Sequence, residues 1–177
     1  MIEVRQLRAA DDRAVFSCGQ PDLDRFFLRY AGQNQFKHHL GVTWVAVDGD
    51  QGDRILGFAT VSASQIEATG LPPELRRRLP RYPLPVLRLA RLGVDQSAQG
   101  RGVGLLLLKS VFVLARQMAR DVGCVGVVVD AKAEAMAFYG RFGFEVIDGL
   151  VEGELGDRPV ATPMFLPLGL IPAIEPD

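Results

Sequence analysis

Alternation of apolar and polar residues predicts strands in the first third of the chain. Residues 4–7 alternate and predict a short first strand. Residues 41–47 are rich in β-branched and aromatic side chains, and residues 55–62 repeat that character. The polar, glycine-containing run 48–53 separates them, so these segments together predict a β-hairpin.

Apolar residues at helical spacing predict three helices. The first begins at Pro21, because proline suits the first turn of a helix and acidic residues favour its positive end. Its apolar stripe consists of Leu23, Phe26, Phe27, Tyr30 and Ala31. The second helix spans about residues 102–122, with an apolar face made of Leu105, Leu108, Phe112, Ala115 and Ala119. The third spans residues 131–142, with Asp130 as its N-cap and Gly143 as its C-terminal stop.

The pattern on either side of the second helix predicts further strands. Residues 122–129 are almost continuously apolar, as expected of an inner strand covered on both faces. Residues 144–147 and 160–166 predict a closing pair of strands. Residues 70–86, rich in proline and arginine, predict an irregular insertion with a short helix at 74–79.

The strand predicted at residues 87–94 changes the parity of its apolar positions. Leu87 and Leu89 share one face, whereas Leu92 and Val94 share the other. A bulge near residues 90–92 would supply an extra residue and leave backbone N–H and C=O groups free for a ligand. Burial of the strand on both faces explains the pattern equally well, so both interpretations stay open.

The composition is that of one ordinary globular domain. Of the 177 residues, 48% are hydrophobic and 23% are charged, which is enough apolar surface for a packed core. No apolar run approaches the roughly 18 residues of a membrane span, and the start lacks the basic-then-apolar order of a signal peptide. We therefore expect a soluble, cytoplasmic protein. Cys18 and Cys124 are too few for a disulfide framework, and the adjacent His38 and His39 predict no metal site.

The formal net charge of −1 argues against a surface that binds nucleic acid everywhere, but the charges are unevenly distributed. Residues 71–101 carry seven arginines against two acids, and residues 143–177 carry seven acids against one arginine. An arginine-rich, flexible segment suits the phosphates of an anionic partner. A solvated loop balanced by an acidic flank explains the same distribution.

The turn before the second helix carries the clearest candidate chemistry. Residues 99–104 read Gln-Gly-Arg-Gly-Val-Gly. Glycines let several backbone N–H groups point into one concavity, and a helix N-terminus adds about half a positive charge, so the turn suits a diphosphate. It lacks the Gly-Lys-Ser/Thr ending of a P-loop, and Asp121 fits poorly as the acidic residue of a dinucleotide-binding fold.

In its sequence context this turn resembles that of the GCN5-related N-acetyltransferases. The shared order is a strand, Val94-Asp95, Gln-x-x-Gly-x-Gly, a long helix, an apolar strand, and a short helix with Phe138-Tyr139 and Phe142-Gly143-Phe144. The resemblance covers about residues 4–166. It implies one α/β (α+β) domain over residues 1–166, with a mixed, mostly antiparallel sheet flanked by helices, and a flexible tail at 167–177.

The same resemblance implies an N-acetyltransferase that uses acetyl-CoA and no metal. The cradle for the coenzyme A pyrophosphate would consist of Gln99, Gly100, Arg101, Gly102, Val103 and Gly104. The bulged strand would offer the backbone of Leu92, Gly93 and Val94 to the pantetheine arm and the acetyl carbonyl. Tyr139 would protonate the departing thiolate, and we expect Asp95 to cap or orient the glycine turn.

A narrower resemblance is to the acetyltransferase toxins of toxin–antitoxin pairs. The segments that carry it are Phe16–Gly19, Leu23–Phe26, Leu79–Pro85, Ala90–Leu92 and Val129–Lys132. It implies that the acceptor is the α-amino group of aminoacyl-tRNA, that a ribbon-helix-helix antitoxin binds the enzyme, and that the chain forms a homodimer. The arginines expected at the RNA backbone are Arg76, Arg77, Arg78, Arg81, Arg88 and Arg91. A small-molecule or protein amine as acceptor, and a non-catalytic acyl-CoA-binding or interaction module, are the alternatives.

Overall fold

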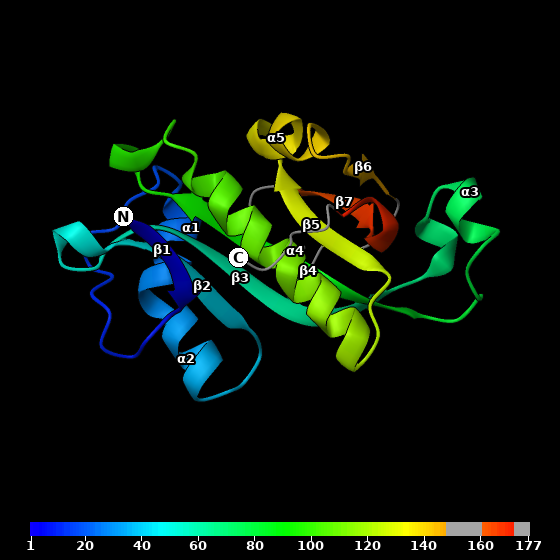
Figure 1. Ribbon diagram of the computed structural model, residues 1–177, viewed down its shortest axis with the longest axis horizontal. Helices are drawn as coiled ribbons and strands as arrows, with labels where there is room; N and C mark the ends of the chain where they lie inside the picture. Colours follow the sequence, from blue (N-terminus) through cyan, green and yellow to red (C-terminus); the bar gives the residue numbers. More distant parts are fainter. Residues whose placement is uncertain (148–160, 172–177) are drawn as a thin grey trace. The chain divides into compact units, whose positions relative to one another are not determined.

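A computed structural model describes residues 1–147 and 161–171 of the chain. Seven strands form one sheet in the order β1-β2-β3-β4-β5-β7-β6 (Figure 1). They are β1 (Ile2–Gln6), β2 (Val42–Asp48), β3 (Arg54–Ile66), β4 (Leu84–Val94), β5 (Gly126–Lys132), β6 (Glu145–Val146) and β7 (Ala161–Pro167). Strand β4 runs parallel to β5, whereas the pairs β1–β2, β2–β3, β5–β7 and β6–β7 are antiparallel. The predicted mixed, mostly antiparallel sheet is therefore confirmed.

Helices and short 3-10 turns connect these strands. The helices are α1 (Pro21–Arg29), α2 (Ala31–Phe36), α3 (Pro73–Arg76), α4 (Val103–Asp121) and α5 (Met136–Gly140). The 3-10 turns are η1 (Gly49–Gln51), η2 (Ala68–Gly70), η3 (Gln96–Ala98), η4 (Ala133–Ala135) and η5 (Leu168–Leu170). Within the part of the chain that the structure describes, no helix is long and apolar enough to cross a membrane.

The chain divides into two compact units, which are described in turn. Unit 1 contains residues 1–62 and 90–111, and unit 2 contains residues 63–89 and 112–177. In unit 1 the predicted hairpin is confirmed, with Asp48 of β2 opposite Arg54 of β3. Gly52 closes its turn in the left-handed region, at φ +66°.

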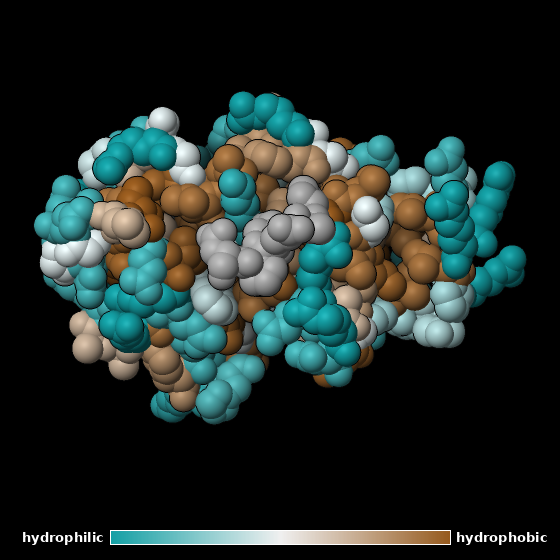
Figure 2. Space-filling view, in the orientation of Figure 1, coloured by the Kyte–Doolittle hydropathy of each residue, from teal (hydrophilic) through white to brown (hydrophobic). Residues whose placement is uncertain are grey.

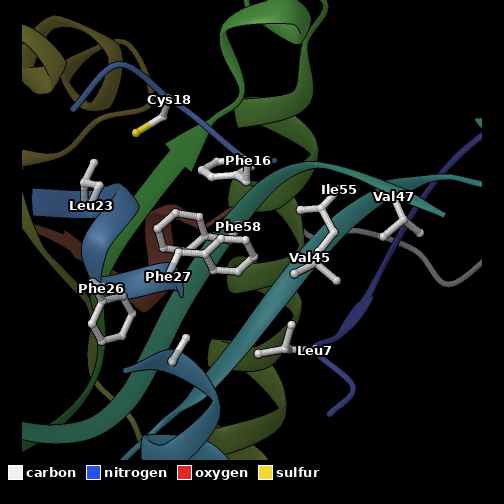
Figure 3. Close-up of a cluster of buried hydrophobic side chains, with 11 residues drawn as sticks. Leu7, Phe16, Cys18, Leu23, Phe26, Phe27, Val45, Val47, Ile55 and Phe58 are labelled. Carbon is white, nitrogen blue, oxygen red and sulfur yellow. The ribbon is translucent and has the colours of Figure 1, made fainter. Parts of the chain in front are cut away.

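An aromatic cluster forms the core of unit 1 (Figure 3). The rings of Phe27 and Phe58 stack with centroids 4.4 Å apart. Phe16 meets both rings edge-on, at 4.9 Å from Phe27 and 5.5 Å from Phe58. Because large aromatic rings contribute much of the apolar area that folding buries, this cluster fixes α1 and the preceding loop against β3.

The central strand of unit 2 is β5, whose Val127, Val128 and Val129 are fully buried. It pairs in parallel with residues 87–89 of β4 and antiparallel with β7. Such a strand is covered on both faces, which explains its continuous apolar run. The predicted closing pair is also present, because β6 pairs with β7.

The predicted boundaries around β5 are wrong. The strand begins at Gly126 and continues to Lys132, so Ala131 lies in a strand and α5 begins only at Met136. Asp130 therefore lies within β5, opposite Pro163, and is not a helix N-cap. Pairing with β7 outweighs the helix propensity of the alanines that follow. The helix also ends earlier than predicted, at Gly140 with Arg141 as its C-cap, so Gly143, at φ +94°, lies in the turn that follows and is not the C-terminal stop of α5.

Four other predictions need smaller corrections. The buried side of α4 consists of Val103, Leu107, Leu108, Val111, Phe112 and Ala115, whereas Leu105 and Ala119 are only half-buried. Tyr30 is exposed and ends α1. Strand β4 begins at Leu84, which shortens the predicted insertion.

The predicted C-terminal tail does not begin at Pro167, because that residue ends β7 and Ile171 is buried. Residues 172–177 of the predicted tail lie outside the described residues.

Candidate functional site

The glycine-rich turn lies in unit 1, between η3 and α4. Gly100 and Gly102 adopt φ values of +81° and +79°, in the left-handed region that L side chains rarely enter. A Cβ atom added to either glycine would have no heavy atom within 4 Å. The backbone conformation, and not crowding, therefore selects glycine here. The open space beside the turn allows a ligand to approach the backbone closely.

The first turn of α4 supplies hydrogen-bond donors at the same place. The N–H of Leu106 donates to the carbonyl of Gly102 at 3.1 Å, which is the first hydrogen bond of the helix. The N–H groups of Val103, Gly104 and Leu105 precede it and have no carbonyl partner within the helix. The partial positive charge of a 19-residue helix adds to these donors. Together they suit a diphosphate.

Asp95 holds the start of this turn, as the sequence predicted. Its carboxylate accepts hydrogen bonds from the backbone N–H of Ser17 at 3.0 Å, and from the N–H and hydroxyl of Ser97 at 3.0 and 2.6 Å. Burial raises the pKa of Asp95, but these hydrogen bonds outweigh burial and the net pKa is lowered. Asp95 is therefore charged at neutral pH and ties the turn to the loop before α1.

The side chain of Gln99 also supports the turn. Its amide donates to the carbonyl oxygens of Cys18 and Val94, each at 3.2 Å. The side chain is thus engaged with the protein's own backbone. The other residues of the predicted cradle, Gly100, Arg101 and Gly102, are exposed, whereas Val103 is buried at the start of α4 and Gly104 is half-buried.

The predicted pantetheine-binding residues lie at the end of β4 in unit 1. Leu92 and Val94 are half-buried, and Gly93 is buried. A Cβ atom on Gly93 would lie 3.0 Å from Cε1 of Phe58 and 3.4 Å from the Cys18 sulfur. Glycine is therefore favoured here by the aromatic core behind it. The bulge predicted near residues 90–92 stays a prediction.

Tyr139, the predicted acid, belongs to α5 in unit 2 and is buried. Its ring contacts Phe138 and Phe144 edge-on, with centroids 5.2 and 5.5 Å away. Burial, and secondly the charge of Asp130, raise the pKa of Tyr139 well above its ordinary value. Its hydroxyl is protonated at neutral pH, as that of an ordinary tyrosine is, and the raised pKa makes it a weaker proton donor than an exposed tyrosine.

Four of the predicted RNA-contacting arginines, Arg76, Arg77, Arg78 and Arg81, are exposed in unit 2. They lie on and directly after α3, and Figure 2 shows hydrophilic residues over the end of unit 2 that carries this helix. Arg91, in unit 1, is half-buried with its guanidinium 3.9 Å from the centroid of the Phe26 ring, a cation–π contact.

The prediction that Arg88 contacts RNA is wrong. Its side chain is 7% exposed, and Nη1 forms an ion pair with Oδ1 of Asp130 at 2.5 Å. A strand position that faces the protein interior explains the difference, because the arginine-rich stretch of sequence continues from an exposed loop into a buried strand.

Sequence reasoning missed the contribution of Ser17 and Cys18, whose backbone groups bind Asp95 and Gln99. No local signal could have revealed it, since these partners lie about 80 positions away. His38 and His39 are exposed. No group of three or more His, Cys, Asp and Glu side chains that could hold a metal occurs within residues 1–147 and 161–171.

The chain is similar to known acetyltransferases. A family model described as an acetyltransferase (GNAT) domain matches residues 39–146. A tRNA-acetylating toxin of Mycobacterium tuberculosis is 34% identical over 143 residues, which cover 80% of this chain and 83% of the relative. A tyrosine-to-phenylalanine variant of KacT has a similar crystal structure, with a TM-score of 0.83, 27% identity and 96% of each chain covered.

A structure of AtaT complexed with acetyl-methionyl-tRNAfMet has the same fold, with a TM-score of 0.81 and 24% identity over 96% of each chain. The family-model match spans more than half of the chain and includes the glycine turn, α4, β5 and Tyr139. The enzyme class and the use of acetyl-CoA expected from the sequence follow from this match. The chain therefore belongs to the GNAT family of N-acetyltransferases, which transfer the acetyl group of acetyl-CoA to an amine.

Proposed function

We propose that this enzyme acetylates the α-amino group of aminoacyl-tRNA. The observation that carries the tRNA part of the proposal is the 34% identity to a tRNA-acetylating toxin over 80% of this chain. The four exposed arginines of residues 73–81, which we call the α3 segment, support it, because guanidinium groups bind phosphates through paired hydrogen bonds. With a net charge of −1, attraction to RNA would come from a local group of cations such as this one and not from the overall charge.

The glycine turn is the proposed site for the pyrophosphate of coenzyme A. The residues assigned to it are Gln99, Gly100, Arg101, Gly102, Val103 and Gly104, with Gln99 acting through its backbone and by shaping the turn. The backbones of Leu92, Gly93 and Val94 are assigned to the pantetheine arm and the acetyl group. The two left-handed glycines and the open space beside them support this assignment.

Tyr139 is the proposed acid. The acceptor nitrogen, as a neutral amine, forms a bond to the thioester carbonyl carbon, and the bond between that carbon and sulfur then breaks. Tyr139 gives its hydroxyl proton to the departing sulfur, and the proton lost by the acceptor nitrogen restores the tyrosine through solvent. The products are an N-acetylated aminoacyl-tRNA and coenzyme A with a free thiol. Tyr139 lies within the residues that the acetyltransferase family model matches, and its hydroxyl is protonated at neutral pH; both observations support this role.

The proposed acceptor also suggests a partner and a location. Charged tRNA is a cytoplasmic molecule, so we place the enzyme in the cytoplasm. Because the similar proteins carry the name toxin, we propose an antitoxin as protein partner, with the ribbon-helix-helix fold that the family resemblance implies. The same resemblance leads us to propose a homodimer as the assembly. A co-expressed antitoxin that abolishes acetylation would support the first proposal.

An acetyl-transfer assay tests the proposal directly. The purified enzyme is incubated with radiolabelled acetyl-CoA and total tRNA, one half aminoacylated and the other half deacylated by mild base. We expect label in the aminoacylated tRNA only, released as N-acetyl amino acid when the ester is hydrolysed. Label transferred to small amines or protein but not to charged tRNA would overturn the proposed acceptor and leave the enzyme class intact.

A further inference from the structure

An ion pair is buried between β4 and β5 in unit 2. Arg88 and Asp130 have side chains 7% and 6% exposed, and Nη1 of Arg88 lies 2.5 Å from Oδ1 of Asp130. Arg88 is opposite Val128 in the parallel register, so Asp130, two residues further along β5, has its side chain on the same face. Nε of Arg88 also donates to the Ser64 hydroxyl at 3.4 Å. The pair is thus held by three adjacent strands.

Such a pair contributes little to stability by itself. Removing two charges from water costs several kcal/mol per ion, and well-packed apolar residues of similar volume commonly replace a buried ion pair without loss of stability. The positions that share a face with the pair, Val86 and Val128, are apolar and fully buried, so an apolar pair would suit this part of the sheet. The charges at positions 88 and 130 therefore point to a role beyond packing.

Tyr139 is the functional group on which the charge of this pair acts. It follows Asp130 through η4, and the charge of Asp130 acts on its buried hydroxyl. The other charged groups on the elements beside Tyr139 are Lys132 at the end of β5, Glu134 in η4 and Arg141 after α5. Lys132 is half-buried and the other two are exposed, so solvent screens them more than it screens Asp130.

We propose that Arg88 and Asp130 act together as positioning residues for Tyr139, with the charge of Asp130 acting on its hydroxyl and Arg88 holding and balancing that charge. This inference rests on the proposed role of Tyr139 as the acid. An uncompensated carboxylate beside the tyrosine would make the tyrosinate formed after proton transfer less stable. Arg88 reduces that cost, because its positive charge balances the charge of Asp130.

Titration of Tyr139 in charge variants tests this proposal. Tyrosines labelled with ¹³C at the ring carbon that carries the hydroxyl are followed by NMR as the pH is raised. The signal that is missing in Tyr139→Phe is that of Tyr139, and the remaining signals belong to the exposed Tyr30 and Tyr82. The variants are Asp130→Asn, Arg88→Met, Arg88→Lys and the double variant Arg88→Met/Asp130→Asn. Glu134→Gln, which removes an exposed carboxylate four residues after Asp130, is the matched control.

We expect the two single changes to move the pKa of Tyr139 in opposite directions. Asp130→Asn should lower it, since Arg88 keeps its charge, whereas Arg88→Met should raise it. The double variant should lie between Asp130→Asn and the wild type, and Glu134→Gln should match the wild type. Loss of structure could not produce this order, because it would shift every variant toward the ordinary tyrosine value of about 10.

The acetyl-transfer rate gives a second readout. Arg88→Met should lower kcat several-fold without changing the KM for acetyl-CoA, and Arg88→Lys should restore most of the loss. An identical Tyr139 titration in the wild type and Asp130→Asn would overturn the proposal, as would an Arg88→Lys variant that regains thermal stability but not kcat. The NMR titration needs no acceptor, so its result is independent of whether charged tRNA is the substrate.

Discussion

The carboxylate of Asp95 accepts a hydrogen bond from the backbone N–H of Ser17, a residue 78 positions earlier in the chain. The backbone carbonyl of Ser17 in turn accepts from the N–H of Gln96 at 2.9 Å. The loop before α1 and the turn before α4 are therefore bound to each other from both sides. A change in this contact should alter the shape of the glycine turn that we propose binds coenzyme A, although neither residue belongs to the predicted cradle.

Asp95→Asn should weaken acetyl-CoA binding and destabilise the fold. One oxygen of Asp95 binds Ser17 and the other binds Ser97, and an asparagine amide can accept at only one of these places. The loss of a buried acceptor costs about 1–3 kcal/mol. Calorimetric titration with acetyl-CoA and chemical denaturation measure the two effects. Asp12→Asn, at an exposed aspartate that also accepts a backbone hydrogen bond, is the control and should change neither quantity appreciably.

The same carboxylate predicts a pH dependence of stability. The pKa of Asp95 in the folded protein is lowered from its model-compound value of 3.8, so its ionised form stabilises the fold. That contribution is fully present above the unfolded pKa and is lost as the pH falls through the folded pKa. The difference in unfolding free energy between wild type and Asp95→Asn should therefore be constant above about pH 5 and shrink below about pH 4. A difference that grows with acidification would contradict the assignment.

Gly102→Ala should weaken acetyl-CoA binding through backbone conformation. No atom lies near the position of the added methyl group, so the change tests the φ of +79° without a steric clash. An L residue held in the left-handed region costs about 1–2 kcal/mol. Gly169→Ala, also in open space but without a positive φ, should leave binding unchanged. Equal binding by Gly102→Ala and the wild type would remove this residue from the proposed cradle.

Local sequence signals were sufficient for much of the fold and for the glycine turn. Proline at the start of α1, the polar turn at residues 48–53 and the glycine spacing at 100–104 act through local backbone geometry, and all appear where the sequence predicts them. The resemblance to the acetyltransferases then connected the turn to acetyl-CoA, a link that the glycines alone did not make. The charge pattern likewise located the exposed arginines of the α3 segment.

The errors arose where tertiary pairing decides the outcome. Asp130 has the local context of an N-cap, yet antiparallel pairing of β5 with β7 extends the strand past it. Arg88 belongs to an arginine-rich stretch, yet it lies at a strand position that faces the interior, where a partner 42 positions away in the sequence pairs with its charge. Neither the strand pairing nor the buried counter-ion leaves a local pattern, and the contact between Asp95 and Ser17 was hidden for the same reason.

Tyr139→Phe should lower kcat by about 10²- to 10⁴-fold, the usual contribution of a general acid, while acetyl-CoA affinity stays unchanged. The hydroxyl is the only group removed, and the ring keeps its contacts with Phe138 and Phe144. Single-turnover rates and equilibrium binding separate the two effects. Tyr82→Phe, at an exposed tyrosine, is the control. An unchanged rate in Tyr139→Phe would exclude Tyr139 as the acid.

Arginine-to-glutamine changes in the α3 segment should weaken the use of tRNA selectively. The double variant Arg77→Gln/Arg78→Gln removes two exposed charges without touching the glycine turn or Tyr139. If these side chains bind RNA phosphates, the KM for charged tRNA should rise. The slope of the logarithm of the tRNA binding constant against the logarithm of the salt concentration should become less steep by up to about 2. KM for acetyl-CoA should not change, because its proposed site lies elsewhere in the chain.

The matched control is Lys109→Gln/Arg120→Gln, which alters the net charge equally at two exposed positions of α4. If both double variants raise KM for tRNA to the same extent, the effect comes from overall charge and the α3 segment is not a specific contact. If only Arg77→Gln/Arg78→Gln does so, RNA backbone binding is assigned to the α3 segment. That outcome would also explain how an enzyme with a net charge of −1 binds a polyanion, because a local group of guanidinium ions acts over the Debye length of about 8 Å at physiological salt.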